Sequence, residues 1–210
     1  SDIGVQILNK GGNAVDAAVA VGFSLAVTLP RAGNLGGGGF MLVYLKERDE
    51  IFYIDYRSKS PLNSSIENIF DLAKSRNLKP QDFTNDMFDK TRYGYKAPAV
   101  PGTVAGLLEA HEKFGKLSLQ EILEPVIRQA EEGILVSYDL SKAIEDTKQL
   151  KFDSESLKIY FNNGEAIKEN SIFKRPDLAK TFRNISKQGR NGFYKGEVAE
   201  NIVKAMNANG

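Results

Sequence analysis

The most apolar stretch of the chain is a continuous run near its beginning. Positions 14–29 read AVDAAVAVGFSLAVTL. Because this run is apolar on nearly every side of a helix, it predicts a helix that lies inside a packed core rather than on the surface. Asn13 can accept the first free backbone N–H groups of this helix, and Asp16 places an acidic side chain near its positive end. Pro30 is expected to end it.

Two strand-like runs follow this helix. The residues FMLVYL at 40–45 are typical of an inner strand, and IFYIDYR at 51–57 predicts a return strand that ends in polar residues. The turn before the first strand contains four consecutive glycines, Gly36–Gly39, which suit a place where another backbone or a ligand comes close. The Walker and dinucleotide-binding motifs space their glycines differently and are followed by a helix, whereas a strand is predicted after this run, so neither motif is present. A tight connection packed under another element is therefore an equally good interpretation of the glycines.

The rest of the pattern is mostly helical. Further helices are predicted at residues 2–9, 66–76, 103–114, 119–133, 138–149, 153–161, 176–187 and 197–207. Ser118 begins a capping-box pattern, and Pro125 is expected to kink or divide the helix that follows. The polar segment 61–99 is interpreted as a surface excursion anchored by aromatic residues.

Composition narrows the possible functions. The net charge is +1, with 28 Lys plus Arg against 27 Asp plus Glu, so nothing in the charge favours a nucleic-acid partner. The absence of Cys excludes disulfides and thiolate metal sites, and one His leaves almost no material for a zinc site. We expect neither a metal nor another cofactor. The single histidine, His111, is predicted to be a solvated residue of the helix at 103–114.

Arg57 is the candidate binding residue. An arginine that closes an apolar strand presents a planar donor fork at the rim of a core, which suits bidentate binding of a carboxylate. The plain alternative is an ion pair with Asp55, which strand alternation places on the same face. Exposed charged residues at strand ends are also common without any function. The residue types alone leave these interpretations open.

Four segments together resemble the γ-glutamyltranspeptidases. They read GGNAVDAAVA at 11–20, GNLGGGGFML at 33–42, IDYR at 54–57 and VPGTVAGL at 100–107, in the order and spacing of that family. The resemblance implies an α+β fold, the αββα sandwich of the N-terminal nucleophile (Ntn) hydrolases. It identifies residues 1–210 as a partial large-subunit region of a precursor that cuts itself into a large and a small subunit. This region is expected to be mostly helical, with a β-hairpin from the central sheet.

The resemblance also implies a reaction. A threonine at the start of the small subunit attacks the γ-carbonyl of glutathione or another γ-glutamyl amide and forms a γ-glutamyl ester, which passes to water or an amino acid. Arg57 matches the arginine that holds the substrate's α-carboxylate. The expected partners are a small γ-glutamyl substrate and the small subunit, whose close approach the Gly36–Gly39 turn would allow. Family members are usually exported, so a periplasmic or secreted location, with a signal sequence upstream of residue 1, is expected.

Two departures keep other functions open. Residues 57–61 read RSKSP, whereas the family commonly has Glu after the arginine, so a related acylase or a poly-γ-glutamate-processing enzyme is an alternative. The family's cleavage site reads Thr-Thr-His, and no Thr in these 210 residues is followed by Thr. The nucleophile is therefore expected elsewhere in the precursor, and a non-catalytic scaffold relative is the second alternative. The region by itself would expose a sheet edge and apolar surface, which favours association.

Overall fold

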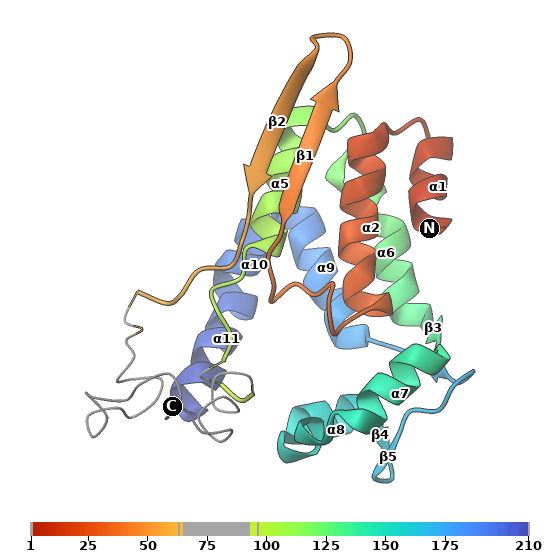
Figure 1. Ribbon diagram of the computed structural model, residues 1–210, viewed down its shortest axis with the longest axis vertical. Coiled ribbons are helices and arrows are strands. Elements are labelled where there is room, and N and C mark those ends of the chain that lie inside the picture. The colour runs from red at the N-terminus through yellow and green to blue at the C-terminus, as the bar shows by residue number, and fades with distance from the viewer. Residues whose placement is uncertain (1, 63, 65–92, 96, 210) are drawn as a thin grey trace, which may run out of the picture.

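The computed structural model describes residues 2–62, 64, 93–95 and 97–209. The helix predicted at 66–76 lies outside the described residues. In chain order, the elements are α1 (Asp2–Asn9), α2 (Ala14–Thr28), β1 (Phe40–Leu45), β2 (Glu50–Asp55), α5 (Thr103–Phe114), α6 (Leu119–Glu132), β3 (Ile134–Leu135), α7 (Tyr138–Asp146), the 3₁₀ helix η3 (Lys148–Phe152), α8 (Ser154–Tyr160), β4 (Phe161–Asn162), β5 (Glu165–Ala166), β6 (Ile172–Phe173), α9 (Pro176–Gln188), α10 (Asn191–Tyr194) and α11 (Gly196–Asn209) (Figure 1).

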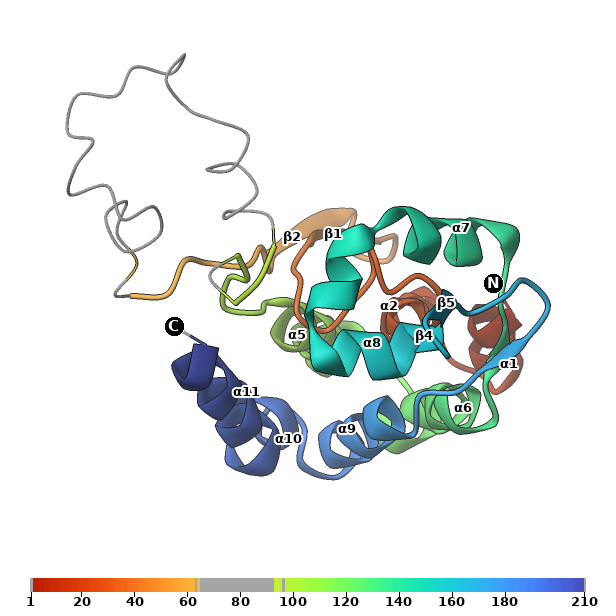
Figure 2. The ribbon, with the colours of Figure 1, turned by 90° about the horizontal axis from the view of Figure 1, so that it is seen from below.

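Helix α2 lies at the centre of the main helical layer, as its apolar sequence predicts. It packs against α1, α5 and α6, and α6 packs in turn against α9 (Figure 1). Phe23 of α2 and Phe182 of α9 are fully buried, and their rings meet edge to face with centroids 6.1 Å apart. Seen along a perpendicular direction, α6, α9, α10 and α11 follow one another along one side of the molecule (Figure 2). A smaller core joins α7 to the β3–β6 and β4–β5 pairs.

A capping box starts α2: Asn13 caps the helix as predicted, and Asp16 completes the box with a return bond that was not predicted. The Asn13 side chain accepts hydrogen bonds from the backbone nitrogens of Val15 and Asp16, both at 2.9 Å. The Asp16 carboxylate in turn accepts the Asn13 N–H at 2.9 Å. Asp16 is fully buried and also accepts backbone N–H groups from Lys116 and Leu117. The box therefore ties the start of α2 to the connection between α5 and α6.

His111 belongs to the same connection. The prediction of a solvated histidine is wrong in part, because the side chain is half-buried and its Nε2 lies 2.8 Å from the carbonyl oxygen of Leu117. The chain folds back after α5 and carries that carbonyl over the last turn of the helix. His111 therefore helps to hold a turn, and no Ser, Thr or acidic side chain is hydrogen-bonded to it within the described residues.

Strands β1 and β2 form an antiparallel hairpin that lies over α5 (Figure 1). Side chains alternate between its faces, so Val43 and Ile54 are buried against the core. The outer face is apolar and open: Leu42 is 72% exposed and Ile51 is 71% exposed. Within the described residues this sheet has two strands. The predicted apolar surface is therefore present.

The second half departs from the prediction in detail. Helix α6 continues through Pro125 and is not divided. The predicted helix 138–149 ends at Asp146, where the Thr147 hydroxyl donates to the Ala143 carbonyl at 2.7 Å, and η3 follows. The two-residue strands and α10 were not predicted, since such short elements carry no readable periodicity. Among the described residues, no helix combines the length and apolar character that crossing a bilayer requires.

Candidate active site

Arg57 lies just beyond the end of β2 and is exposed. The strand ends two residues earlier than predicted, because the Asp55 side chain accepts the backbone N–H of Arg57 at 2.9 Å and turns the chain out of the ladder. Within the described residues, the Arg57 guanidinium makes no ion pair, so Asp55 binds the backbone of Arg57 and not its side chain. The donor fork of Arg57 is therefore open to a ligand.

The glycine-rich turn runs directly beneath this strand end. The backbone nitrogen of Tyr56 donates to the Gly39 carbonyl at 3.0 Å, and the backbone nitrogen of Gly39 donates to the Tyr56 carbonyl at 3.3 Å. A Cβ on Gly38 would overlap the backbone nitrogen of Ser58, and one on Gly39 would come within 2.8 Å of the Tyr56 ring. None of the glycines from 36 to 39 has a positive φ. Gly38 and Gly39 therefore have no room for a side chain because residues 56–58 pack on them, which supports the interpretation as a tight packed connection at these two positions.

The start of α5 closes the other side of Tyr56. The backbone nitrogens of Gly102 and Thr103 both donate to the Gly37 carbonyl, at 2.8 and 3.1 Å. A Cβ on Gly102 would overlap the Tyr56 carbonyl oxygen, and one on Gly106 would overlap the Tyr56 ring. Tyr56 therefore lies between the glycine turn and the first turns of α5, and burial raises the pKa of its hydroxyl. The residue before Arg57 is held from both sides by backbone.

A second pair of contacts extends this support past Arg57. The backbone of Lys59 pairs with that of Val100 through two hydrogen bonds, 3.2 Å from the Lys59 nitrogen and 2.8 Å from the Val100 nitrogen. Ser58, which stands where the family commonly has Glu, is half-buried between these fixed points. Arg57 is thus an exposed side chain on a backbone that is fixed before and after it.

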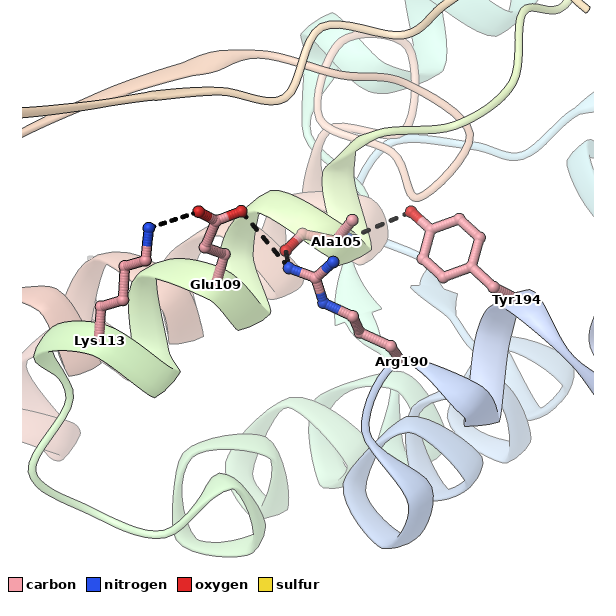
Figure 3. Close-up of polar contacts among 5 residues, drawn as sticks. All are labelled: Ala105, Glu109, Lys113, Arg190 and Tyr194. Atoms are coloured by element: carbon pink, nitrogen blue, oxygen red, sulfur yellow. Dashed lines mark hydrogen bonds and ion pairs between the residues drawn. The ribbon is translucent and has the colours of Figure 1, made fainter.

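Sequence reasoning missed two residues that hold the first turn of α5, Tyr194 of α10 and Arg190 just before that helix. The Tyr194 hydroxyl accepts the Ala105 N–H at 3.1 Å and donates to the Pro101 carbonyl at 2.9 Å. Arg190 donates to the Ala105 carbonyl at 3.1 Å (Figure 3). Only one sequence signal bears on them: the helix at 103–114 starts from Gly102, which has no side chain to cap it. That feature indicates that the first N–H groups of the helix need an acceptor from elsewhere in the fold, but it does not identify the acceptor.

Within the described ranges, no group of three or more His, Cys, Asp or Glu side chains gathers in a way that could hold a metal ion. Arg57 is an exposed cationic side chain at the end of β2, on a backbone that the Tyr56 and Lys59 contacts fix. Such an arrangement can bind and orient a carboxylate.

Comparisons with known proteins identify the family. The family model described as gamma-glutamyltranspeptidase matches residues 1–210. The chain is 40% identical over 212 residues to a glutathione hydrolase proenzyme of Pseudomonas sp. (strain A14), which covers 100% of this chain and 35% of the relative. It is 34% identical over 201 residues to the capsule biosynthesis protein CapD proenzyme of Bacillus anthracis, covering 96% of this chain and 32% of that protein.

The structural comparison gives the same result. The crystal structure of Helicobacter pylori gamma-glutamyltranspeptidase superposes with a TM-score of 0.89 at 39% identity, over 100% of this chain and 57% of that chain. This confirms the predicted α+β fold, a mostly helical part of an Ntn hydrolase with a β-hairpin. The chain spans about a third of the length of the curated relatives. It belongs to the γ-glutamyltranspeptidase family.

Proposed function

We propose that the protein containing this chain transfers γ-glutamyl groups from glutathione and other γ-glutamyl amides to water or to amino acids. The observation that carries the proposal is the open guanidinium of Arg57 on a backbone fixed by Gly38, Gly39 and Gly102. A γ-glutamyl donor presents an α-carboxylate, which a planar donor fork binds in a bidentate manner. Family membership supplies the reaction class.

In this mechanism Arg57 holds the α-carboxylate and thereby fixes the distance from that anchor to the γ-carbonyl. The threonine hydroxyl at the start of the small subunit adds to the γ-carbonyl carbon, and its proton passes to the threonine's own α-amino group. The amide C–N bond then breaks, and that proton leaves with the amine. Water or an acceptor amine attacks the resulting ester by the same steps and releases the γ-glutamyl group. The chain described here contributes orientation, which can supply a large part of the rate enhancement.

The first experiment is to express the complete gene and to measure the intact mass and N-terminal sequence of every polypeptide obtained. We expect two chains, the smaller beginning with Thr. A single uncut chain would support the scaffold alternative, in which the fold is kept without a nucleophile.

The second experiment tests Arg57 in the processed enzyme. The Arg57→Lys variant keeps the charge and loses the donor fork, so kcat/KM for a γ-glutamyl donor should fall by tens-fold or more. Arg48→Lys is the matched control, because Arg48 is also exposed and lies in the turn of the same hairpin. Unchanged kinetics for Arg57→Lys would remove Arg57 from the site.

A second candidate function is action on longer γ-glutamyl chains. The similarity to the capsule biosynthesis protein CapD and the presence of Ser58 in place of Glu favour this candidate. Competition between glutathione and a poly-γ-glutamate oligomer for the same processed enzyme distinguishes the two. A higher kcat/KM for the oligomer would establish the second candidate.

A further inference from the structure

The Tyr194 hydroxyl on α10 makes a two-sided contact with the start of α5. It accepts the backbone N–H of Ala105 at 3.1 Å (Figure 3). It also donates to the backbone carbonyl of Pro101 at 2.9 Å. Burial is the largest influence on the pKa of this hydroxyl and raises it above the ordinary value. The hydroxyl therefore stays protonated at neutral pH and can make both bonds at once.

The start of α5 needs such a partner. The first backbone N–H groups of a helix have no acceptor within the helix. The N-cap residue is Gly102, which has no side chain to cap α5. The Thr103 N–H is satisfied by the Gly37 carbonyl, and the Ala105 N–H is satisfied by Tyr194. The first turn of α5 is thus held by the glycine turn on one side and by α10 on the other.

Arg190 strengthens the same contact from the preceding residues of the chain. Its Nη2 lies 3.1 Å from the Ala105 carbonyl oxygen and 3.4 Å from a carboxylate oxygen of Glu109. Lys113 binds the other oxygen of Glu109 at 2.7 Å (Figure 3). These ion pairs are partly exposed, so each contributes little to stability by itself. Their geometry nevertheless fixes how α10 sits against the first turns of α5.

The residues that Tyr194 holds directly precede the ones that pack on Tyr56. Pro101 precedes Gly102 and Ala105 precedes Gly106, and these two glycines leave no room for a Cβ against Tyr56. Because no side chain lies between the two backbones, a shift of the first turn of α5 is passed directly to Tyr56 and so to the residue after it. Close-packed backbones have no free space between them that could absorb such a shift.

We propose that Tyr194 is a positioning residue for Arg57: its hydroxyl locks the first turn of α5, which in turn fixes the strand end that carries the guanidinium. This inference rests on the proposed role of Arg57 as the carboxylate anchor. It adds a determinant of donor binding located on a helix that contributes no group to the site. A residue that acts in this way affects the donor's carboxylate and leaves the bond-making step alone.

The competing explanation is that Tyr194 only stabilises the fold. Its ring packs edge to face on buried Phe193, with centroids 5.0 Å apart. Tyr194→Phe keeps this ring and removes only the hydroxyl. Tyr44→Phe is the matched control, because it removes a hydroxyl that donates to Asp49 at 3.0 Å on the exposed side of the β1–β2 hairpin.

The test uses the complete processed enzyme with a γ-glutamyl anilide and with the 4-aminobutyryl anilide, which lacks the α-carboxylate. For Tyr194→Phe we expect KM for the γ-glutamyl anilide to rise about three- to tenfold, because both hydrogen bonds of the hydroxyl are lost and only part of that loss reaches Arg57. We expect kcat to stay nearly constant, and kcat/KM for the 4-aminobutyryl anilide to stay unchanged. Tyr44→Phe should change neither donor's kinetics.

A double-mutant cycle with Arg57→Gln completes the test. If Tyr194 acts through Arg57, adding Tyr194→Phe to Arg57→Gln causes no further loss. Equal losses with both donors, or losses that add in the double variant, would overturn the positioning role while leaving the proposed function intact. Wild-type kinetics for Arg57→Gln alone would remove Arg57 as the carboxylate anchor and overturn the positioning role with it, whereas failure of the wild-type enzyme to turn over the γ-glutamyl anilide would overturn the proposed function. Arg190→Gln, which removes the contact at the Ala105 carbonyl, provides the same readout if Tyr194→Phe yields too little processed enzyme.

Discussion

Both carboxylate oxygens of Asp16 lie 3.0 Å from the backbone nitrogen of Lys116, 100 residues further along the chain. The same carboxylate accepts the N–H of Asn13 at 2.9 Å and that of Leu117 at 3.3 Å, and it is fully buried. A buried carboxylate that collects several backbone donors in this way is a structural joint. It fixes the start of the central helix to the end of the helix that supports the candidate site.

Asp16→Asn tests this joint. The amide would place an N–H group among backbone N–H groups and leave at least one buried donor without an acceptor. We expect a loss of about 2–4 kcal/mol of stability, measured by thermal unfolding of the complete protein. Asp139→Asn is the control, because Asp139 also lies in the first turn of a helix but is exposed. Equal shifts for the two variants would show that Asp16 acts only through the helix dipole.

The glycine turn yields a sharper comparison. Gly36 and Gly38 are both exposed, yet a Cβ on Gly38 would overlap the Ser58 backbone, whereas one on Gly36 would lie 3.3 Å from the side-chain oxygen of Asn34. Gly38→Ala should displace the residues next to Arg57 and lower kcat/KM about tenfold to a hundredfold. Gly36→Ala should stay within about threefold of the wild type. A tolerated Gly38→Ala variant would contradict the packing described here.

The Arg175–Asp177 pair leads to a prediction about pH. Partial burial acts to raise the pKa of Asp177, but hydrogen bonds and charge from Arg175 outweigh it and hold that pKa below its ordinary value. A carboxyl with a lowered pKa in the folded state stabilises the protein above its unfolded pKa of about 4 and loses this effect as the pH falls through the folded value. Asp177→Asn should therefore lower the melting temperature at pH 7 and have less effect at pH 3.

Solvent exposure of the Arg175–Asp177 pair sets how much the pair contributes to stability. The Arg175 side chain is 13% exposed and packs over Tyr160 and Phe173, whereas the Asp177 side chain is 58% exposed. Water screens the carboxylate, so we expect about 1 kcal/mol or less at pH 7. Thermal scans of wild type and Asp177→Asn at pH 7, 5 and 3 provide the measurement. A difference in melting temperature between wild type and Asp177→Asn that grows toward pH 3 would contradict a lowered pKa of Asp177.

The outer face of the β1–β2 hairpin predicts the behaviour of residues 1–210 expressed alone. Leu42 and Ile51 are exposed beside Phe40, Tyr44 and Tyr53, and such an apolar sheet face promotes association. We expect oligomers by light scattering and a shift toward monomer in the Leu42→Lys, Ile51→Lys double variant. Leu62→Lys is the control, because Leu62 is fully exposed away from the hairpin and should have no effect. A monomeric wild-type fragment would refute the prediction.

Features fixed by neighbours in sequence could be predicted from the chain alone. The Asn13 cap of α2, the position of Arg57 near a strand end and the helical bounds Thr103–Phe114 all rest on local pattern. The glycine run also indicated a close backbone approach. Sequence could not identify Tyr56 and Ser58 as the backbone that approaches, because packing partners leave no mark at a fixed spacing.

Long-range polar contacts account for what the sequence did not reveal. Asp16 has the residue type and position of an ordinary helix-start acid, and only the fold brings Lys116 to it. Tyr194 has no pattern that distinguishes it from a core tyrosine, and its role follows from the position of α10 beside Ala105. His111 was read as solvated for the same reason, because the carbonyl of Leu117 reaches it only through a fold-back of the chain.

The contact between Tyr194 and Ala105 also sets an order of events during synthesis. These residues are 89 positions apart, and ribosomes add about 5–20 residues per second, so the first turn of α5 leaves the ribosome about 4–18 seconds before its hydroxyl partner. During that interval the strand end that carries Arg57 can pack on its glycine neighbours, but the first turn of α5 beside it lacks the hydrogen bond from Tyr194. The nascent chain therefore completes the support of this strand end late, only after α10 has been made.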